Sequence, residues 1–174
     1  MIVRRTIDKD ELKELPKVVF PGSFDPITNG HKSIILKILD IFKSVDVVVL
    51  NNINKNHLFS IEERKDIILN IFKNYENVRV NTYNGLLANY VKENDVNLLV
   101  RGVRNSLDFE SEKINAKVNK ELCGVETLLL FSESSDEYIS SSVVKDVFLN
   151  GGNVDLYVDK IVLDMLYRKF RRNG

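Results

Sequence analysis

The sequence contains a single cysteine and no excess of charge of either sign. Both facts exclude some classes of protein and some kinds of partner. Cys123 is the only cysteine among 174 residues, so the chain cannot close an internal disulfide or build a metal cluster on cysteine. The 25 basic and 25 acidic residues give a formal net charge of zero, which argues against an extended nucleic-acid-binding surface and predicts no nucleic-acid partner. A small phosphate-binding cleft stays compatible with this balance because it needs only a few local cations.

Long apolar runs are absent as well. No stretch approaches the length of a membrane span, and residues 1–16 are mostly charged and lack the apolar centre of a signal peptide. We therefore expect a soluble, cytoplasmic protein with no membrane contact. A chain of this length supports one hydrophobic core, so we expect residues 17–174 to form a single domain and residues 1–16 to be an N-terminal extension outside it.

Five short apolar runs alternate with segments of helical periodicity. Strands are expected at residues 18–20, 45–50, 78–82, 96–100 and 126–131. The helices that follow these strands are expected to end near Phe42, Phe72, Glu93, Leu122 and Phe148, before a last helix from Val158 or Asp159 to Phe170. Ser60 and Glu63 form a capping box at the start of the second helix. The alternation predicts an α/β fold: a doubly wound, five-stranded parallel sheet with helices on both faces and right-handed connections.

The loop after the first strand, residues 21–31, reads Pro-Gly-Ser-Phe-Asp-Pro-Ile-Thr-Asn-Gly-His. In a parallel sheet such a loop lies at the carboxyl end of its strand, where ligands bind, and the next helix presents free backbone N–H groups to an anion. Thr28 and His31 are three residues apart, so a hydroxyl and an imidazole could converge on that anion beside Gly30, which has no Cβ. The alternative is ordinary turn chemistry, with Asp25 or Thr28 as the helix N-cap.

Two arginines follow the fourth predicted strand in the run Arg101-Gly102-Val103-Arg104. Guanidinium groups match phosphate oxygens in a bidentate manner, so we interpret this pair as an anion site. Asp108 and Glu112 follow one helical turn apart. They could contact a ribose or a metal, but their spacing alone favours a solvated helix face.

Two further polar stretches lie where strands are expected to end. Residues 51–57 form a loop rich in turn formers, and residues 136–142 end in three serines at a helix start. Those serines offer hydroxyls and free N–H groups to a polyphosphate or, alternatively, redundant N-capping. Because the carboxyl ends of parallel strands share one edge of a sheet, we expect all four polar stretches to meet there.

Three motifs occur together in the chain: Gly22 to His31, Arg101 to Arg104 followed by Asp108-Phe109-Glu110, and Tyr138 to Ser142. Together they resemble the phosphopantetheine adenylyltransferase family, a branch of the nucleotidyltransferase superfamily with the Thr/His-x-Gly-His signature. The likeness extends from about Val18 to about Phe170. It implies transfer of AMP from ATP to 4′-phosphopantetheine, which yields dephospho-coenzyme A and pyrophosphate in coenzyme A biosynthesis.

The resemblance also implies roles for individual residues. His31, Lys55 and Arg104 would serve the catalytic step, with His31 stabilising the α-phosphate in the transition state. The residues implied to bind the acceptor are Ser23, Lys55, Leu87 and Arg101. Those implied to bind ATP are Ser23, Phe24, His31, Gly102, Val103, Arg104, Glu112, Asp136, Glu137, Tyr138, Ile139, Ser140, Ser141 and Ser142.

The resemblance further implies a homohexamer and Mg²⁺ as a cofactor. The ion would bridge the ATP phosphates with few protein ligands, so no dedicated metal site is expected in the chain. Residues 51–57 and 113–116 depart from the family's pattern, on the side that would hold the acceptor. Two other interpretations stay open: transfer to a different phosphorylated acceptor, and a nucleotide- or coenzyme A-binding protein that has lost turnover.

Overall fold

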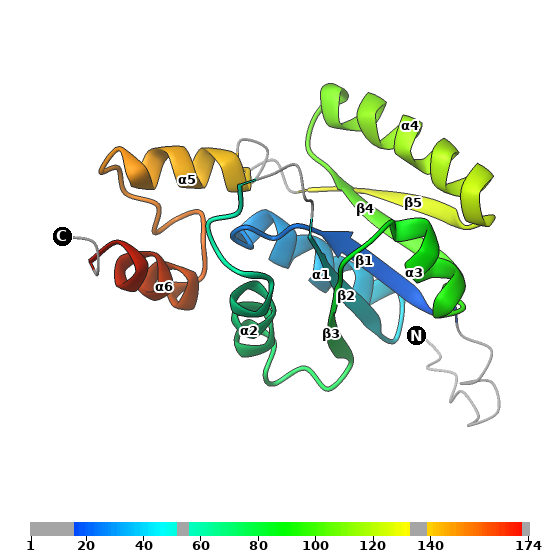
Figure 1. Ribbon diagram of the computed structural model, residues 1–174, viewed down its shortest axis with the longest axis horizontal. Helices are drawn as coiled ribbons and strands as arrows, with labels where there is room; N and C mark the ends of the chain where they lie inside the picture. Colours follow the sequence, from blue (N-terminus) through cyan, green and yellow to red (C-terminus); the bar gives the residue numbers. More distant parts are fainter. Residues whose placement is uncertain (1–15, 52–55, 133–138, 172–174) are drawn as a thin grey trace, which may run out of the picture.

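The computed structural model describes residues 16–51, 56–132 and 139–171. Five parallel strands form one sheet in the order β3-β2-β1-β4-β5, with helices on both faces (Figure 1). The strands are β1 (Val18–Gly22), β2 (Val45–Leu50), β3 (Val78–Tyr83), β4 (Leu98–Val103) and β5 (Glu126–Phe131). The helices are α1 (Asn29–Ile41), α2 (Ile61–Ile71), α3 (Leu87–Glu93), α4 (Ser106–Cys123), α5 (Ser141–Leu149) and α6 (Lys160–Arg171). The predicted doubly wound α/β fold is confirmed.

Two hydrophobic clusters, one on each face of the sheet, hold the layers together. The larger packs α1, α2, α5 and α6 against the strands through buried side chains that include Ile35, Ile68 and Leu166. The smaller joins α3 to the opposite face around Val48 and Tyr90. The remaining helix, α4, packs against α3, β4 and β5, yet none of its 18 residues is buried. The site therefore rests on a sheet whose central strands are covered on both sides.

Helix starts follow local side-chain chemistry. The predicted capping box of α2 is present: Ser60 Oγ accepts from the Glu63 N–H at 3.1 Å, and Glu63 Oε2 accepts from the Ser60 N–H at 2.7 Å. A second capping box opens α1, where Thr28 is the N-cap and His31 takes the position that an acidic residue usually occupies. Of the two N-cap candidates considered for α1, Thr28 is therefore the one that serves.

The central strand β1 is interrupted on one side by Pro21. The sequence predicts that the strand ends before this proline, but pairing with β2 continues to Gly22. On the other side, pairing with β4 stops at Val19. Proline has no N–H to donate to the ladder. The Pro21 carbonyl oxygen instead accepts a hydrogen bond from Arg101 Nη1, which brings a guanidinium to the carboxyl end of the sheet.

β4 begins and ends later than the sequence predicts. The expected strand 96–100 is wrong at both ends because residues 98–103 pair continuously with residues 126–131 of β5. Arg101 and Gly102 therefore belong to the strand, and Arg104 lies in the loop after it. The last helix begins at Lys160, slightly after its predicted start. The expected extension, apart from Pro16, lies outside the described residues, among which no helix is long and apolar enough to cross a membrane.

Candidate active site

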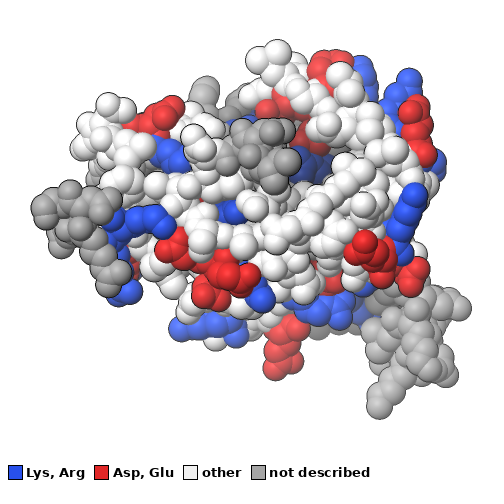
Figure 2. Space-filling model, in the orientation of Figure 1, with Lys and Arg blue, Asp and Glu red and all other residues white. Residues whose placement is uncertain are grey.

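A cavity of about 480 Å³ opens at the carboxyl ends of β1 and β4. Its lining comes from all four polar stretches that the sequence predicts to meet at this edge, and the described part of each contributes. The lining residues include Ser23, Asp25, His31, Asn56, His57, Arg101, Gly102, Arg104, Ile139, Ser140, Ser141, Ser142 and Lys145. The predicted convergence is therefore confirmed for the described residues. Basic and acidic side chains are interspersed on the face of the molecule shown in Figure 2.

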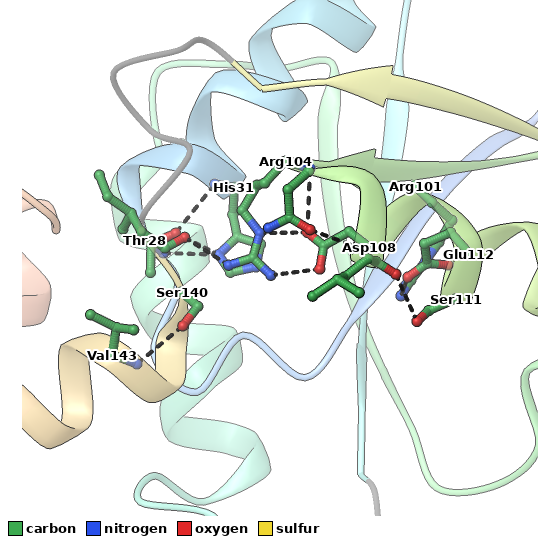
Figure 3. Close-up of polar contacts among 12 residues, drawn as sticks. Thr28, His31, Arg101, Arg104, Asp108, Ser111, Glu112, Ser140 and Val143 are labelled. Atoms are coloured by element: carbon green, nitrogen blue, oxygen red, sulfur yellow. Dashed lines mark hydrogen bonds and ion pairs between the residues drawn. The ribbon is translucent and has the colours of Figure 1, made fainter.

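His31 is held in one orientation by the N-cap of α1 (Figure 3). Its Nδ1 accepts a hydrogen bond from the Thr28 backbone N–H at 3.1 Å and lies 2.9 Å from Thr28 Oγ1. Because a backbone N–H can only donate, Nδ1 must carry no proton, and the proton of the neutral ring sits on Nε2. His31 thus has one N–H to offer a ligand. Thr28 also lines the cavity, but it is buried and its hydroxyl lies against the His31 ring, so the expected contact of this hydroxyl with an anion stays a prediction.

The charge of His31 is set by its surroundings. Burial is the largest cause that lowers the pKa of His31, followed by the positive charges of Arg104 and Arg101, and together they bring it to about 4. At neutral pH the ring is therefore uncharged. A neutral imidazole with its proton on Nε2 can donate a hydrogen bond to a phosphate oxygen but cannot act as a cation there.

The two arginines each have a carboxylate partner on α4 (Figure 3). Arg101 contacts Glu112 through Nε at 2.8 Å and Nη2 at 2.6 Å. Arg104 contacts Asp108 through Nε at 2.8 Å and Nη2 at 3.2 Å, and its Nη1 donates to the Ile139 carbonyl oxygen at 3.1 Å. These bidentate pairs orient both guanidinium planes before any ligand binds.

The expectation of a solvated face for Asp108 and Glu112 is wrong. Their side chains are only 25% and 12% exposed, and both point to the arginines rather than to solvent. The spacing of four residues does place them on one face of α4, as expected, but β4 and the loop after it supply arginine partners for that face. The sequence could have indicated this, because two arginines three residues apart precede two acids four residues apart.

In the serine cluster, residues 140–142, the hydroxyl groups of Ser140 and Ser141 form different hydrogen bonds. Ser140 is the N-cap of α5, and its Oγ accepts from the Val143 N–H at 3.1 Å (Figure 3). Ser141 Oγ donates to the Pro26 carbonyl oxygen at 2.8 Å, which ties the start of α5 to the loop after β1. All three serines line the cavity. The start of α5 therefore faces the same space as the start of α1, and both present backbone N–H groups to it.

Asp25 organises the floor of the site, a role that the sequence pattern did not assign to it. Its buried carboxylate accepts from the N–H groups of Leu58 at 2.8 Å and Phe59 at 2.9 Å, and Lys145 Nζ lies 3.0 Å away. Burial raises the pKa of Asp25, but the two backbone bonds and Lys145 outweigh it and lower the pKa overall. His57 approaches the same carboxylate at 3.6 Å. Lys145 is a cavity-lining cation that sequence reasoning missed, because nothing local indicates its partner.

Phe24 is placed by a tight backbone turn. Its φ of 47° lies in the left-handed region, and its ring is buried against Phe20 and edge-on to His31. A Cβ on Gly22 would lie 2.7 Å from the ring, so glycine is required where the chain folds back. The Phe24 ring therefore packs against the His31 ring and helps to hold it in place. Gly102 has a related role, because a Cβ there would lie 3.1 Å from Ile34 of α1.

Several residues that the sequence predicts for the site either do not line the cavity or lie outside the described residues. Leu87 does not line the cavity; it packs at the start of α3 on the opposite face of the sheet. The side chain of Val103 is fully buried, so only its backbone can face a ligand. Lys55, Asp136, Glu137 and Tyr138 lie outside the described residues.

Whether the protein could bind the expected Mg²⁺ directly depends on the acidic side chains of the cavity. Asp25, Asp108 and Glu112 each already have a lysine or arginine partner. Across residues 16–51, 56–132 and 139–171 no group of three or more His, Cys, Asp or Glu side chains is placed to hold a metal. This donor set fits an ion that arrives on the phosphates of a nucleotide, not a cage made by the protein.

The fold and this site define a nucleotidyltransferase of the cytidylyltransferase-like type, and the model of the cytidylyltransferase-like family matches residues 19–147. The phosphopantetheine adenylyltransferase of Syntrophotalea carbinolica is 45% identical over 153 residues, which cover 87% of this chain and 92% of the relative. That of Thermotoga neapolitana is 43% identical over 154 residues, which cover 88% and 96%. The chain belongs to the phosphopantetheine adenylyltransferase family.

A solved structure supports the fold independently. The nicotinic acid mononucleotide adenylyltransferase of Plasmodium falciparum, complexed with NaAD, aligns with a TM-score of 0.59 at 17% identity, covering 88% of this chain and 95% of that one. At this identity the likeness concerns the fold alone.

Proposed function

We propose that the protein transfers AMP from ATP to 4′-phosphopantetheine and releases pyrophosphate, forming dephospho-coenzyme A. The observation that carries the proposal is His31, a neutral imidazole locked with its donor on Nε2 and flanked by Arg104 and Arg101. Adenylyl transfer needs such a donor at the α-phosphate, where negative charge moves in the transition state. Membership of the family supplies the choice of acceptor.

The chemistry requires no general base. A phosphate oxygen of the acceptor attacks the α-phosphorus of ATP, the new P–O bond forms, and the bond from the α-phosphorus to the oxygen that bridges the α- and β-phosphates breaks. The electron pair leaves with pyrophosphate. The attacking oxygen is already ionised, so catalysis consists of alignment and stabilisation of charge. His31 donates to the α-phosphate, and the helix starts of α1 and α5 receive the remaining phosphate oxygens.

The proposal divides the cavity between the two substrates. Arg101 and Ser23 would contact the acceptor, and Lys55 would bind its phosphate. Leu87, which lies outside the cavity lining, would contact the pantetheine arm of the acceptor beyond the cavity. Gly102 to Arg104, Glu112, and residues 136–142 would hold ATP. The pairing of Glu112 with Arg101 supports a position for Glu112 at the boundary of the two subsites. A Lys55→Ala variant is expected to weaken acceptor binding while ATP binding is retained.

Mg²⁺ is proposed as the cofactor, carried by the ATP phosphates. When bound, it neutralises phosphate charge and supports departure of pyrophosphate. No described carboxylate of the cavity is proposed as its ligand, because each is paired with a protein cation. The work of the chain itself is then to orient the phosphates through His31, Arg101 and Arg104.

A homohexamer in the cytoplasm is the proposed form of the enzyme. The exposed apolar residues of α4 and β5 support an assembly, since Leu107, Ile114 and Phe131 are 79%, 61% and 61% exposed. β5 is also an edge strand of the sheet. Size-exclusion chromatography with light scattering tests the number of subunits.

Turnover with a panel of acceptors tests the proposed reaction. Purified protein is incubated with ATP and Mg²⁺ and with 4′-phosphopantetheine, nicotinamide mononucleotide or glycerol 3-phosphate, and products are identified by mass. Dephospho-coenzyme A from 4′-phosphopantetheine alone is the expected result. Product with another acceptor alone would overturn the assignment of substrate. Absence of any product while ATP still binds would instead indicate a binding protein.

A further inference from the structure

Asn29 and Lys32 flank Gly30 and His31 in the sequence. Both form hydrogen bonds with the segment that joins α5 to α6, residues 150–159. The Asn29 backbone N–H donates to the Tyr157 carbonyl oxygen at 2.9 Å, and Asn29 Nδ2 donates to the Leu156 carbonyl oxygen at 3.0 Å. Lys32 Nζ donates to Asp159 Oδ2 at 2.7 Å. None of these contacts takes part in the chemistry proposed above.

The segment is firmly held where it makes these contacts. Val154 and Val158 are 1% and 4% exposed and belong to the main hydrophobic cluster, and Val162 and Leu166 of α6 continue the same row. Asp159 also starts α6, since its Oδ1 accepts from the Ile161 N–H at 3.4 Å. The partners of Asn29 and Lys32 therefore lie on a part of the molecule that is anchored in the core.

The same segment follows the C-terminal end of α5, the helix whose first turn faces the cavity. α5 begins at Ser141 beside the cavity, and after it ends the chain returns past the start of α1 before it enters α6 (Figure 1). The carbonyl groups that hold Asn29 thus lie on the chain that leaves α5. A shift of the first turn of α1 relative to residues 156–159 would break these bonds.

We propose that Asn29 and Lys32 are positioning residues for His31, and that residues 156–159 act as a clamp that holds the first turn of α1, and with it the imidazole, in place at the cavity. The proposal rests on the proposed adenylyl transfer. The capping box fixes the ring within α1, whereas the clamp places that turn of α1 in the cavity. Small displacements matter because a hydrogen bond to a transition state depends steeply on the position of its donor.

Steady-state kinetics of clamp variants test the proposal. Lys32→Met and Asp159→Asn each remove the ion pair, and asparagine keeps a side-chain oxygen for the cap of α6. Asn29→Ala removes the bond to Leu156. We expect the double variant Asn29→Ala with Lys32→Met to lower kcat about tenfold. KM for ATP and for the acceptor should change less than about twofold, because the displaced donor acts mainly in the transition state.

Two control variants separate positioning from general stability. Lys169 of α6 forms an ion pair with Glu63 of α2 at 2.8 Å, and the side chains of this pair are 35% and 36% exposed, against 36% and 29% for Lys32 and Asp159. Lys169→Met therefore perturbs α6 without touching α1. Its kcat should stay within about twofold of the wild type. Lys32→Arg keeps the pair with Asp159 and should retain wild-type kcat. If the double variant matched Lys169→Met in kcat, the clamp would have no catalytic role.

A spectroscopic readout tests the clamp independently of turnover. The chain contains two histidines, so ¹⁵N NMR of the imidazoles is readily assigned with a His57→Gln reference. In the wild type, the His31 shifts should indicate a proton on Nε2 and an accepting Nδ1. In the double clamp variant, the binding of ATP should perturb the Nε2 shift less than it does in the wild type. An identical perturbation in both proteins would overturn the clamp.

The kinetic and NMR experiments together distinguish failure of the clamp from failure of the proposed function. An active wild type with an unaffected double variant rejects the clamp alone. A wild type that forms no adenylated product rejects the proposed function. The NMR comparison with ATP then still decides whether residues 156–159 position His31.

Discussion

Arg64 Nη1 donates a hydrogen bond to the Ser23 carbonyl oxygen at 2.7 Å from a side chain that is only 1% exposed. The same nitrogen donates to the Leu50 carbonyl oxygen at 3.1 Å. A guanidinium of α2 thus satisfies carbonyl groups from the ends of β1 and β2 and joins the two loops that form one wall of the cavity. Burial lowers the pKa of Arg64, and the nearby charge of Asp25 opposes this shift.

Replacement of Arg64 by methionine is expected to destabilise the protein strongly. Arg64→Met leaves the partly buried carbonyl oxygens of Ser23 and Leu50 without this donor and removes one of the positive charges near Asp25, which keeps Lys145, so the free energy of unfolding should fall by about 3 kcal/mol. Urea denaturation measures it. Lys113→Met is the control, because its exposed ion pair with Glu110 should contribute less than about 1 kcal/mol. Equal midpoints for the two variants would contradict the bracing role of Arg64.

Two substitutions at His31 separate catalysis from capping. His31→Ala should lower kcat by two to three orders of magnitude, roughly the effect of losing a transition-state donor, and should also weaken the start of α1. His31→Gln keeps a side-chain acceptor at the third helical position, as in the usual capping box, so the helix cap should survive. We therefore expect kcat to fall in both variants, while thermal melting shows a clear loss of stability only in His31→Ala. Comparable turnover in His31→Gln and the wild type would contradict the catalytic role.

The lowered pKa of His31 predicts a pH dependence of stability. From the ordinary value of 6.5 down to about 4, the unfolded chain binds a proton at this residue and the folded protein does not. The free energy of unfolding should therefore decrease as the pH falls through this window, and His31 should contribute no slope above it. Asp25, Asp159 and Glu63, whose pKa values are lowered from 3.8, 3.8 and 4.5, add a slope of the same sign at the acidic end of this window. Urea denaturation at several pH values measures the slope, which should be smaller in His31→Gln.

Arg104→Lys tests the geometry of the guanidinium rather than its charge. Lysine keeps the positive charge but cannot contact Asp108 through two nitrogens and the Ile139 carbonyl oxygen at once. We expect kcat/KM for ATP to fall by about tenfold or more, because the charge is no longer held in place. Arg79→Lys on β3 is the matched control, since Arg79 pairs with Asp46 outside the cavity lining. Similar kinetics for the two variants would show that charge alone suffices.

Local patterns in the sequence were enough to predict the fold and the place of the site. Strand β2 and strand β5 lie where their apolar runs predict them, and the capping box of Ser60 and Glu63 is formed as expected. Such features depend on residues a few positions apart, and the alternation of strands and helices then places the loops after β1 and β4 on one edge. His31, Arg101 and Arg104 could be selected as cavity residues for this reason.

Contacts between distant residues were decided only by the tertiary structure. Asp25 receives bonds from Leu58 and Phe59 and an ion pair from Lys145, which is 120 positions away. Lys32 and Asp159 are 127 positions apart. No periodicity or spacing rule connects residues at such separations, because their approach depends on how whole elements pack.

Arg101 and Arg104 illustrate both what the sequence determines and what only the tertiary structure decides. The sequence by itself determined that two guanidinium groups lie at the carboxyl edge of a parallel sheet, next to a helix start that carries His31. Only the tertiary structure decided that Glu112 and Asp108 hold them and that Pro21 leaves a carbonyl free for Arg101. The physical reason is that strand and helix periodicity act locally along the chain, whereas the partner of a buried charge is chosen by the three-dimensional packing around it.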